Sequence, residues 1–304
     1  MKKRTPIAAF GFYPGSKQDL INSIKECFKK AGQSIDYNLA NRSPSGPRKI
    51  IAGISPHAGY VFSGPTASKL MAEIAHDGKP ESFILLGVAH GTYLPISALM
   101  QQGAWETPLG DIEIDSELAE AILSNSKVLV DNESAHYNEH SIEVQLPFLQ
   151  YIFDDIKIVP ISISARDIIT LEDIGKAIAK ASKAIGRDVL ILASTDMTHY
   201  GMAYGYAPVG NGPIDKVLDY MKKVDGEAIK EIESINPSGL VKLVEESGMT
   251  MCGASPVAAC LFAVKEYGDV KVETLDYTTS WHAAPKYRSP GQVVGYYSAK
   301  ITRN

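Results

Sequence analysis

Three of the seven histidines in this chain each follow a short apolar run, and an imidazole in such a place can bind a metal ion or transfer a proton. His57 lies in SPHAGY, His90 in GVAHGTY and His199 in STDMTHYG. The runs before them have the nearly all-apolar composition of strands buried on both faces: 48–54, 83–88 and 188–194. Because ligands bind at the carboxyl ends of the strands in open α/β sheets, we expect the three imidazoles to converge. A glycine within two residues of each histidine suits a tight turn there: Gly59, Gly91 and Gly201.

Cys252 has a different setting from the other two cysteines of the chain. It lies in GMTMCGASP, between two predicted helices, and precedes a glycine at a turn. A thiolate there would be stabilised by the N-terminus of the following helix and could act as a metal ligand or as a nucleophile. Cys27 and Cys260 lie within helical patterns, and we expect them to be buried apolar residues far from the site. The odd, low number of cysteines argues against disulfides and for a reducing compartment.

Two spacings near these histidines could bring a carboxylate or a further ring to the site. Asp196 precedes His199 by three residues, and if this segment turns helically, the carboxylate could orient the imidazole as a general base or as a fixed ligand. In HYNEHSIEVQLP, His140 and Glu143 stand at the start of a predicted helix and could point into the crevice. For His136, four residues earlier, we expect a structural role in the first helical turn.

The order of the predicted elements indicates an α/β fold. Helical patterns alternate with the apolar runs: 16–31, 63–75, 115–125, 138–152 and 170–185. A fourth buried strand is expected at 157–163, and two further strands, 271–279 and 292–298, close the chain. Such alternation predicts a mostly parallel central sheet with helices on both faces, and we expect one domain over 1–304. The Gly- and Pro-rich stretch 205–216 is expected to be a surface excursion or a lid.

The composition limits the classes of partner. The net charge is −5 and the pI about 5.8, which gives no support to nucleic-acid binding, since proteins of that class usually carry a basic excess. The N-terminus lacks the pattern of a signal peptide, and no run approaches the roughly 20 apolar residues that cross a bilayer. We therefore expect no membrane partner and a cytoplasmic location. No glycine-rich phosphate loop is evident, so the expected ligand is a small molecule other than a nucleotide.

Several motifs, in order along nearly the whole chain, resemble those of the Memo (mediator of cell motility) family. They are SPHAGYVFSG, EHSIEVQLPFLQ, STDMTHYG, MTMCGASPVAA and the ending VVGYYSA, together with FYPG near the N-terminus and TPLGDIEID at 107–115. Memo proteins in turn resemble the class III extradiol dioxygenases, and this likeness implies a LigB-like α/β/α sandwich with a mostly parallel sheet. Those dioxygenases hold Fe(II) with two histidines and a glutamate and use another histidine as an acid or a base.

This resemblance assigns roles by position in the sequence. His57 and His90 match the two histidine ligands, and Cys252 matches the cysteine that replaces the dioxygenase glutamate in Memo proteins. His199 matches the acid/base histidine, with Asp196 beside it. The resemblance therefore implies a metal centre with two imidazoles, one thiolate and a proton-transferring histidine.

The remaining positions include one match and two departures. His140 matches a histidine of the Memo pocket. Around the second ligand, Memo proteins usually carry GPxH, whereas this chain has GVAH, which is expected to move His90 slightly. The loop after the strand 271–279 carries Trp281 and His282 where small and acidic residues are usual, which is expected to change what fits the pocket.

Two metal-dependent functions follow from this set of residues. With Fe(II), which the resemblance favours, the open positions of the site imply an oxygenase or redox enzyme that acts on a small phenolic or cyclic substrate. Two imidazoles and a thiolate also suit copper or Zn²⁺, because a thiolate is a soft ligand. Zinc would imply a hydrolase that uses a metal-bound water.

Two further functions need no active metal. The site could be vestigial in a binding module, because eukaryotic Memo relatives are described as adaptors in receptor signalling. A thiol enzyme that uses Cys252 with a histidine is the other. The gene neighbours of microbial Memo relatives also imply an AMMECR-type protein as a partner.

Overall fold

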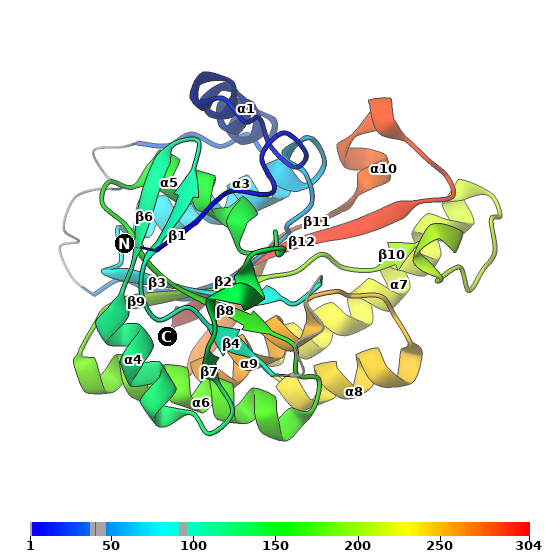
Figure 1. Ribbon diagram of the computed structural model, residues 1–304. Helices are drawn as coiled ribbons and strands as arrows, with labels where there is room; N and C mark the ends of the chain where they lie inside the picture. The colour runs from blue at the N-terminus through cyan, green and yellow to red at the C-terminus, as the bar shows by residue number, and fades with distance from the viewer. Residues whose placement is uncertain (1, 37–39, 41–46, 91–95) are drawn as a thin grey trace.

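The computed structural model describes residues 2–36, 40, 47–90 and 96–304, and it consists of a sheet between two layers of helices (Figure 1). The strands are β1 (Lys3–Arg4), β2 (Ile50–Ser55), β3 (Ser82–Val88), β4 (Ala98–Leu99), β5 (Ala104–Thr107), β6 (Gly110–Ile114), β7 (Val130–Asp131), β8 (Lys157–Ile163), β9 (Val189–Ser194), β10 (His199–Tyr200), β11 (Val270–Thr279) and β12 (Val293–Arg303). The helices are α1 (Lys17–Lys30), α3 (Tyr60–Asp77), α4 (Ser116–Asn125), α5 (Leu146–Ile152), α6 (Ile168–Ile185), α7 (Ile214–Glu233), α8 (Pro237–Ser247), α9 (Ala254–Lys265) and α10 (Ser280–Ala283). Short 3-10 helices lie at Glu133–His136, Glu143–Gln145, Met202–Tyr204 and Pro285–Tyr287.

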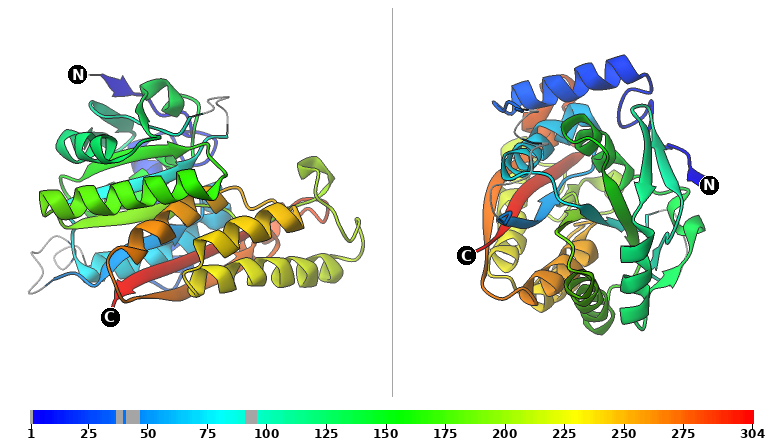
Figure 2. Two further views of the ribbon diagram at one scale, coloured as in Figure 1. Left: turned by 90° about the horizontal axis from the view of Figure 1, so that it is seen from below. Right: turned by 90° about the vertical axis from the view of Figure 1, so that its left-hand side faces the viewer.

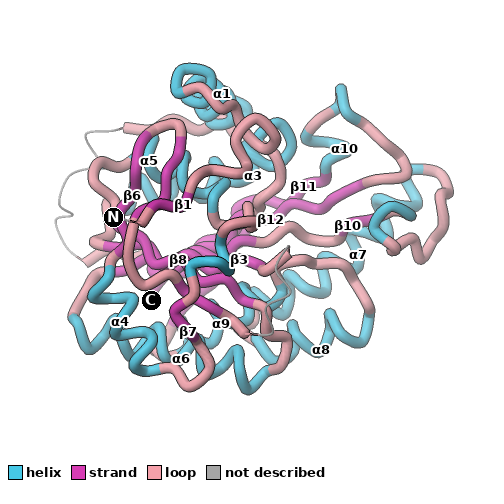
Figure 3. The backbone as a smooth tube through the Cα atoms, in the orientation of Figure 1, coloured by secondary structure: helices cyan, strands magenta, loops and turns pink. Residues whose placement is uncertain are grey.

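The centre of the sheet is parallel. Within the described residues, one 12-stranded sheet has the order β1-β5-β6-β8-β3-β9-β2-β12-β10, with β11 beside β12 and β4 beside β7 and β8 (Figure 3). The neighbours β8, β3, β9 and β2 are all parallel, and every residue of β2 and β9 is buried. Strands covered on both faces must be apolar throughout, which explains the apolar runs in the sequence. Because these strands are parallel, the loops that follow them lie at one edge of the sheet.

Helices cover both faces of the sheet, which makes the fold an α/β/α sandwich. On one face α3 packs on β2 and β12, and α1 and α5 pack against α3. On the other face α9 packs on β9 and β3, α6 lies beside α9, and α4 and α8 flank this pair (Figure 2). The predicted fold class is therefore confirmed, whereas one domain over 1–304 stays a prediction. Among the helices of the described ranges, none has the length and apolar character needed to span a membrane.

The predicted helix 138–152 is wrong in its first part. A 3-10 turn at Glu143–Gln145 leads into α5, which begins only at Leu146. The reason is local, because the Glu139 carboxylate accepts the N–H of Ser141 at 2.6 Å and offers the backbone an alternative to a helical hydrogen bond. His140 therefore precedes the helix. The expected surface excursion at 205–216 is a loop as far as residue 213, after which α7 begins.

Of the glycines predicted at turns, Gly201 has a backbone conformation that needs glycine. Its φ is +136°, and a Cβ there would collide with the backbone of Gly291. Gly59 has an ordinary φ of −57°. Gly91 lies outside the described residues.

A buried ion pair joins β1 to the segment before α5. Arg4 and Glu143 are in contact, and both side chains are fully buried. Arg4 also donates from Nε to the carbonyl of His136 at 3.0 Å and from Nη2 to the carbonyl of Glu139 at 2.6 Å. Its guanidinium lies 4.5 Å from the centre of the Trp105 ring. One arginine thus fixes three points along residues 136–143.

The N-terminal segment completes the surroundings of Glu143. The carboxylate accepts the N–H groups of Ile7 and Ala8, each at 2.9 Å, and the hydroxyl of Tyr13. The expectation that Glu143 points into a ligand crevice is therefore wrong, because its oxygens are occupied by buried protein donors. Glu143 instead ties residues 4–13 to the loop that carries His140.

We predict that Arg4→Met lowers the free energy of unfolding by about 3–5 kcal/mol, because it leaves the Glu143 carboxylate buried without its cation. Urea unfolding measures this change. Lys176→Met is a matched control, since Lys176 pairs with Glu172 on the surface of α6, and such pairs contribute less than about 1 kcal/mol. An Arg4→Met variant as stable as the control would contradict the prediction.

His136 is a buried neutral ring. It packs against Trp105 with ring centres 5.5 Å apart, and within the described part of the chain its two ring nitrogens have no hydrogen-bond partner. Burial, and then the positive charge of Arg4, lower the pKa of His136 to about 3. The structural role expected for His136 fits this setting, but its polar atoms are not paired within the helical turn.

This burial predicts a pH dependence of stability. Between about pH 6.5 and pH 3 the unfolded chain binds a proton on His136 and the folded chain does not, so stability falls as the pH falls. His136→Gln should remove about 2 kcal/mol of the loss between pH 7 and pH 5. Urea midpoints measured across this range test it. The prediction fails if the variant loses stability as steeply as the wild-type protein.

Candidate metal centre

The donor atoms of His57, His90 and Cys252 lie within 4.8 Å of one another. His57 follows β2, His90 follows β3, and Cys252 lies in the turn before α9. The Sγ atom of Cys252 is 3.2 Å from Nε2 of His57. The parallel order of β3, β9 and β2 explains why loops distant in sequence meet here.

The tautomer of His57 follows from its contacts with serine and glutamine. The Oγ of Ser194 donates its single proton to the carbonyl of Ser141 at 2.7 Å and accepts a hydrogen bond from Nε2 of Gln145 at 2.9 Å. It can therefore only accept from Nδ1 of His57, which is 2.9 Å away. Burial, and then the charge of neighbouring histidines, keep the pKa of His57 well below its ordinary value. The lone pair of the neutral ring thus lies on Nε2 and faces Cys252.

His90 is oriented by a carboxylate. Glu139 accepts the backbone N–H of His90 at 2.7 Å, and its two oxygens lie 3.1 and 3.2 Å from Nδ1 of the ring. Burial would raise the pKa of Glu139, but hydrogen bonds from His90 and from the Ser141 amide outweigh it and lower the pKa to about 2. An ionised Glu139 holds the proton on Nδ1 and leaves Nε2 as the donor atom, the usual arrangement for a metal-ligating histidine.

The Cys252 thiol is half-buried and lies against the end of β9. Its Sγ accepts the N–H of Asp196 at 3.3 Å. Gly253 follows, and a Cβ there would collide with Thr195, so only glycine lets this turn approach the strand so closely. Burial, and then the charge of Asp196, raise the pKa of the thiol. The expected stabilisation of a thiolate by the N-terminus of α9 does not prevail here, which disfavours a free thiol nucleophile. A bound cation would favour the thiolate.

His199 is held by a backbone carbonyl. Its Nδ1 lies 3.1 Å from the carbonyl of Thr250, and its N–H donates to the Thr250 hydroxyl at 2.9 Å. Because a carbonyl oxygen can only accept, Nδ1 carries a proton, and Nε2 is the ring nitrogen that Thr250 leaves unused. The rings of His57, His90 and His140 form a cluster with centres 5.0–5.5 Å apart, and the electrostatic influence of His199 reaches His57.

The expected helical turn from Asp196 to His199 is wrong. Residues 195–198 are irregular and His199 begins β10. The Asp196 carboxylate instead accepts the N–H of His57 at 2.9 Å and a hydrogen bond from the amide of Ala58. Burial raises the pKa of Asp196. Asp196 thus fixes the loop that carries the candidate ligand His57. The His199 ring nitrogen that Asp196 was expected to orient instead contacts the carbonyl of Thr250.

His140 lines the pocket between two rings. It stacks on Phe12 with ring centres 4.2 Å apart and on His90 with centres 5.0 Å apart. Burial is the main cause that lowers its pKa. His90, Glu139 and His140 also have donor atoms within 4.8 Å of one another. Because three N–H donors already occupy Glu139, we assign this second group to the support of His90.

The cysteines without an expected role behave as predicted. Cys27 in α1 and Cys260 in α9 are buried, and all three cysteines are free thiols. Burial raises the pKa of each of these two thiols to about 12. Cys252 alone among the three belongs to the donor group.

The departures from the family pattern fall in different places. His90, the last residue of GVAH, lies among the donors, and a slight movement relative to the family pattern stays a prediction. Residues 91–95, which follow it, lie outside the described residues. Trp281 is half-buried under the guanidinium of Arg288, 4.9 Å from the ring centre. His282 is exposed and lines a hollow of about 570 Å³ between α7 and β11, whose lining includes none of the three candidate ligands.

Known proteins resemble this chain over nearly its whole length. A family model described as a Memo-like protein matches residues 4–300. A MEMO1 family protein of Thermococcus onnurineus is 41% identical over 300 residues, which are 97% of this chain and 98% of the relative. MEMO1 family proteins of Pyrococcus abyssi and Methanopyrus kandleri are 40% and 37% identical over 305 and 302 residues, with 99% of each chain covered.

A solved structure supports the fold. The crystal structure of an uncharacterized protein from Escherichia coli K12 is similar with a TM-score of 0.52 and 12% sequence identity. The likeness covers 83% of this chain and 99% of that one. With the family model and the relatives spanning nearly the whole sequence, the chain belongs to the Memo family.

Proposed function

We propose that this protein binds one divalent metal ion through His57, His90 and Cys252 and is a dioxygenase-like redox enzyme for a small phenolic or cyclic substrate. One observation carries the proposal. Both ring N–H groups face protein acceptors, Ser194 and Glu139, so both Nε2 lone pairs are left for a cation beside the thiol.

The donor set fits a transition metal. Ligands about 2.0–2.3 Å from one ion lie at most about 4.6 Å apart, and the three donor atoms here are already within 4.8 Å of one another. We favour Fe(II), and copper and Zn²⁺ are the alternatives because the thiolate is a soft ligand. When bound, Fe(II) would supply one-electron and O₂ chemistry that the side chains lack.

The protein's own residues would bind, orient and transfer protons. Ser194 and Glu139 hold the ligand rings, and Asp196 fixes the loop of His57. His199, whose Nδ1 is held by the Thr250 carbonyl, would exchange a proton with the substrate hydroxyl through Nε2. His140, stacked on Phe12, would form one wall for a flat substrate.

Zinc-dependent hydrolysis is the second candidate function. The observation that favours it is the cysteine sulfur in the donor group, since cysteine is a common zinc ligand. In that case His199 would transfer the proton of the attacking water. Three further expectations stay predictions: a binding module with an inactive site, an AMMECR-type partner and a cytoplasmic location. The metal content of the purified protein tests the first of them.

We predict that the purified protein holds close to one metal ion per chain and that Cys252→Ala and His57→Ala lose it. Elemental analysis of protein purified without oxygen measures the content. Cys260→Ala is the matched control, because it removes a buried thiol that no candidate ligand contacts, and it should keep the metal. Iron supports the redox enzyme and zinc supports the hydrolase. Wild-type protein without metal would overturn both and favour the binding module.

His199→Ala should keep the metal and lose turnover by roughly 10²–10⁴-fold, the usual contribution of proton transfer. Oxygen consumption with a panel of catechols measures turnover, and elemental analysis measures the metal. Tyr204→Phe is the control, because Tyr204 packs edge-on against His199 at 5.2 Å between ring centres without holding its nitrogen. Loss of metal in His199→Ala would make His199 a ligand, and unchanged turnover would remove its catalytic role.

A further inference from the structure

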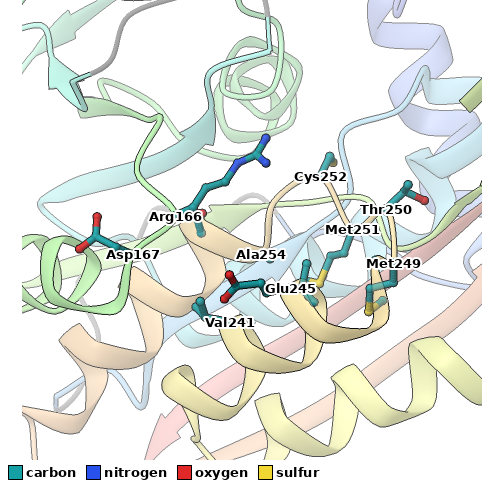
Figure 4. A pocket seen from close by; sticks show the side chains of 12 residues that line it. Arg166, Asp167, Val241, Glu245, Met249, Thr250, Met251, Cys252 and Ala254 are labelled. Carbon is teal, nitrogen blue, oxygen red and sulfur yellow. The ribbon is translucent and has the colours of Figure 1, made fainter. Parts of the chain in front are cut away.

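A hollow of about 760 Å³ opens beside the candidate metal centre. It is lined by the loop after β8, the second half of α8, the turn 248–252 and the first residues of α9 (Figure 4). Cys252, a candidate ligand, and Thr250, whose carbonyl holds the His199 ring, both belong to its wall. A volume of this size suits a small organic molecule. The hollow therefore shares one candidate ligand, Cys252, with the site where chemistry is proposed.

Arg166 supplies the cation of this hollow. It lies in the loop after β8, the strand beside β3, and its side chain extends toward the side of the hollow on which Cys252 lies (Figure 4). In contrast to Arg4, Arg48 and Arg187, which all have carboxylate partners, Arg166 has neither an ion pair nor a hydrogen bond to any residue that the structure describes. A guanidinium offers a planar fork of N–H donors that fits a carboxylate.

The other charges of the lining limit the charge of a ligand. Asp167 caps α6 by accepting the N–H of Thr170 at 2.9 Å, and this hydrogen bond lowers its pKa. Glu245 projects from α8 into the same lining. A dianion such as a phosphate ester would be repelled by the carboxylates of Asp167 and Glu245 and attracted by only one guanidinium. A monoanion is repelled less and is matched by the single guanidinium.

The rest of the wall is apolar. Side chains from α8, the turn and α9 form it: Val241, Val244, Met249, Met251 and Ala254. Methionines adapt to irregular shapes, so this wall can hold an aliphatic or aromatic linker without a fixed outline. The hollow thus offers one cationic end, near Cys252, and an apolar body.

We propose that the substrate is a monocarboxylate whose carboxylate binds Arg166 and whose apolar body lies against α8 and the turn 248–252. This inference rests on the proposed function, because it assumes that a substrate held by Arg166 beside Cys252 reaches the metal centre. Arg166 would then be a specificity-determining residue. It would select acids over their neutral analogues and act on substrate binding rather than on proton transfer.

The test measures ligand binding to metal-free protein, so that its outcome is independent of whether a metal is bound. Hexanoate, hexanamide and hexyl phosphate serve as probes; the first two share one alkyl tail, and hexyl phosphate carries a phosphate on a tail one carbon longer. Calorimetric or NMR titration of the wild-type protein should give saturable binding of hexanoate in the millimolar range. Binding should be weaker for hexyl phosphate and weakest for hexanamide.

Variants then assign this preference to Arg166. Arg166→Ala should weaken hexanoate binding about tenfold or more, as for the loss of one charge-assisted hydrogen-bonding group, and Arg166→Lys should restore part of it. Glu245→Gln should strengthen binding. Lys242→Ala is the matched control, because Lys242 is an exposed cation of α8 outside the lining, and it should change little.

The proposal is overturned if hexanoate does not bind, if hexanamide binds as well, or if Arg166→Ala equals the control. Tighter binding of hexyl phosphate would replace the carboxylate with a phosphate as the ligand class and also overturn it. A protein that binds hexanoate through Arg166 but holds no metal would keep this inference and reject the proposed redox function.

Discussion

The segment 139–145 is the constraint on which the candidate site depends, because it crosses the carboxyl ends of three parallel strands. Glu139 holds His90 after β3, and the Ser141 hydroxyl accepts the N–H of Val88 at 2.9 Å. The Ser141 carbonyl accepts the Ser194 hydroxyl at the end of β9, and Ser194 in turn orients His57 after β2. In a buried region each unpaired polar group is costly, so these bonds form together or not at all. Both candidate ligand rings are thereby fixed by one loop.

The buried ion pair between Arg4 and Glu143 fixes the position of that segment more than it adds to the net stability of the fold. A buried ion pair such as Arg4–Glu143 gains little over an apolar pair, since desolvation offsets most of its Coulomb energy. Its effect here is positional, because three donors of Arg4 and the amides of residues 7 and 8 admit only one register between the N-terminal segment and residues 136–143. The N-terminal residues, far from the metal centre in sequence, thus determine the position of Glu139.

The sequence predicts the parts of the site that depend on local pattern. An all-apolar run followed by a histidine indicates the end of a buried strand, and a cysteine before a glycine at the start of a helix indicates a turn. The donor group of His57, His90 and Cys252 could therefore be predicted from these local patterns and from the family motifs. The partners of those rings could not. Asp196 lies three residues from His199 in sequence, yet β9 lies beside β2 and the carboxylate reaches the loop of His57 instead. Nothing in the sequence marks Ser194 and Thr250 as partners of the rings, because a lone hydroxyl or carbonyl acquires such a role only through tertiary contact. The helix α7 is also not among the predicted elements.

The arrangement of lone pairs bears on whether the site binds a metal or is merely structural. A buried histidine that only fills space is most stable when both of its nitrogens meet hydrogen-bonding partners. His57 has a strong acceptor at Nδ1, but at Nε2 the neighbour that the structure provides is the thiol of Cys252, which is a weak donor. His199 repeats the first part of the pattern, with the proton of Nδ1 directed at the Thr250 carbonyl. Several rings directed in this way leave electron pairs around one small space, an arrangement that folding alone does not favour and that a bound cation would stabilise. This cost is the physical argument that supports the proposed metal-binding function.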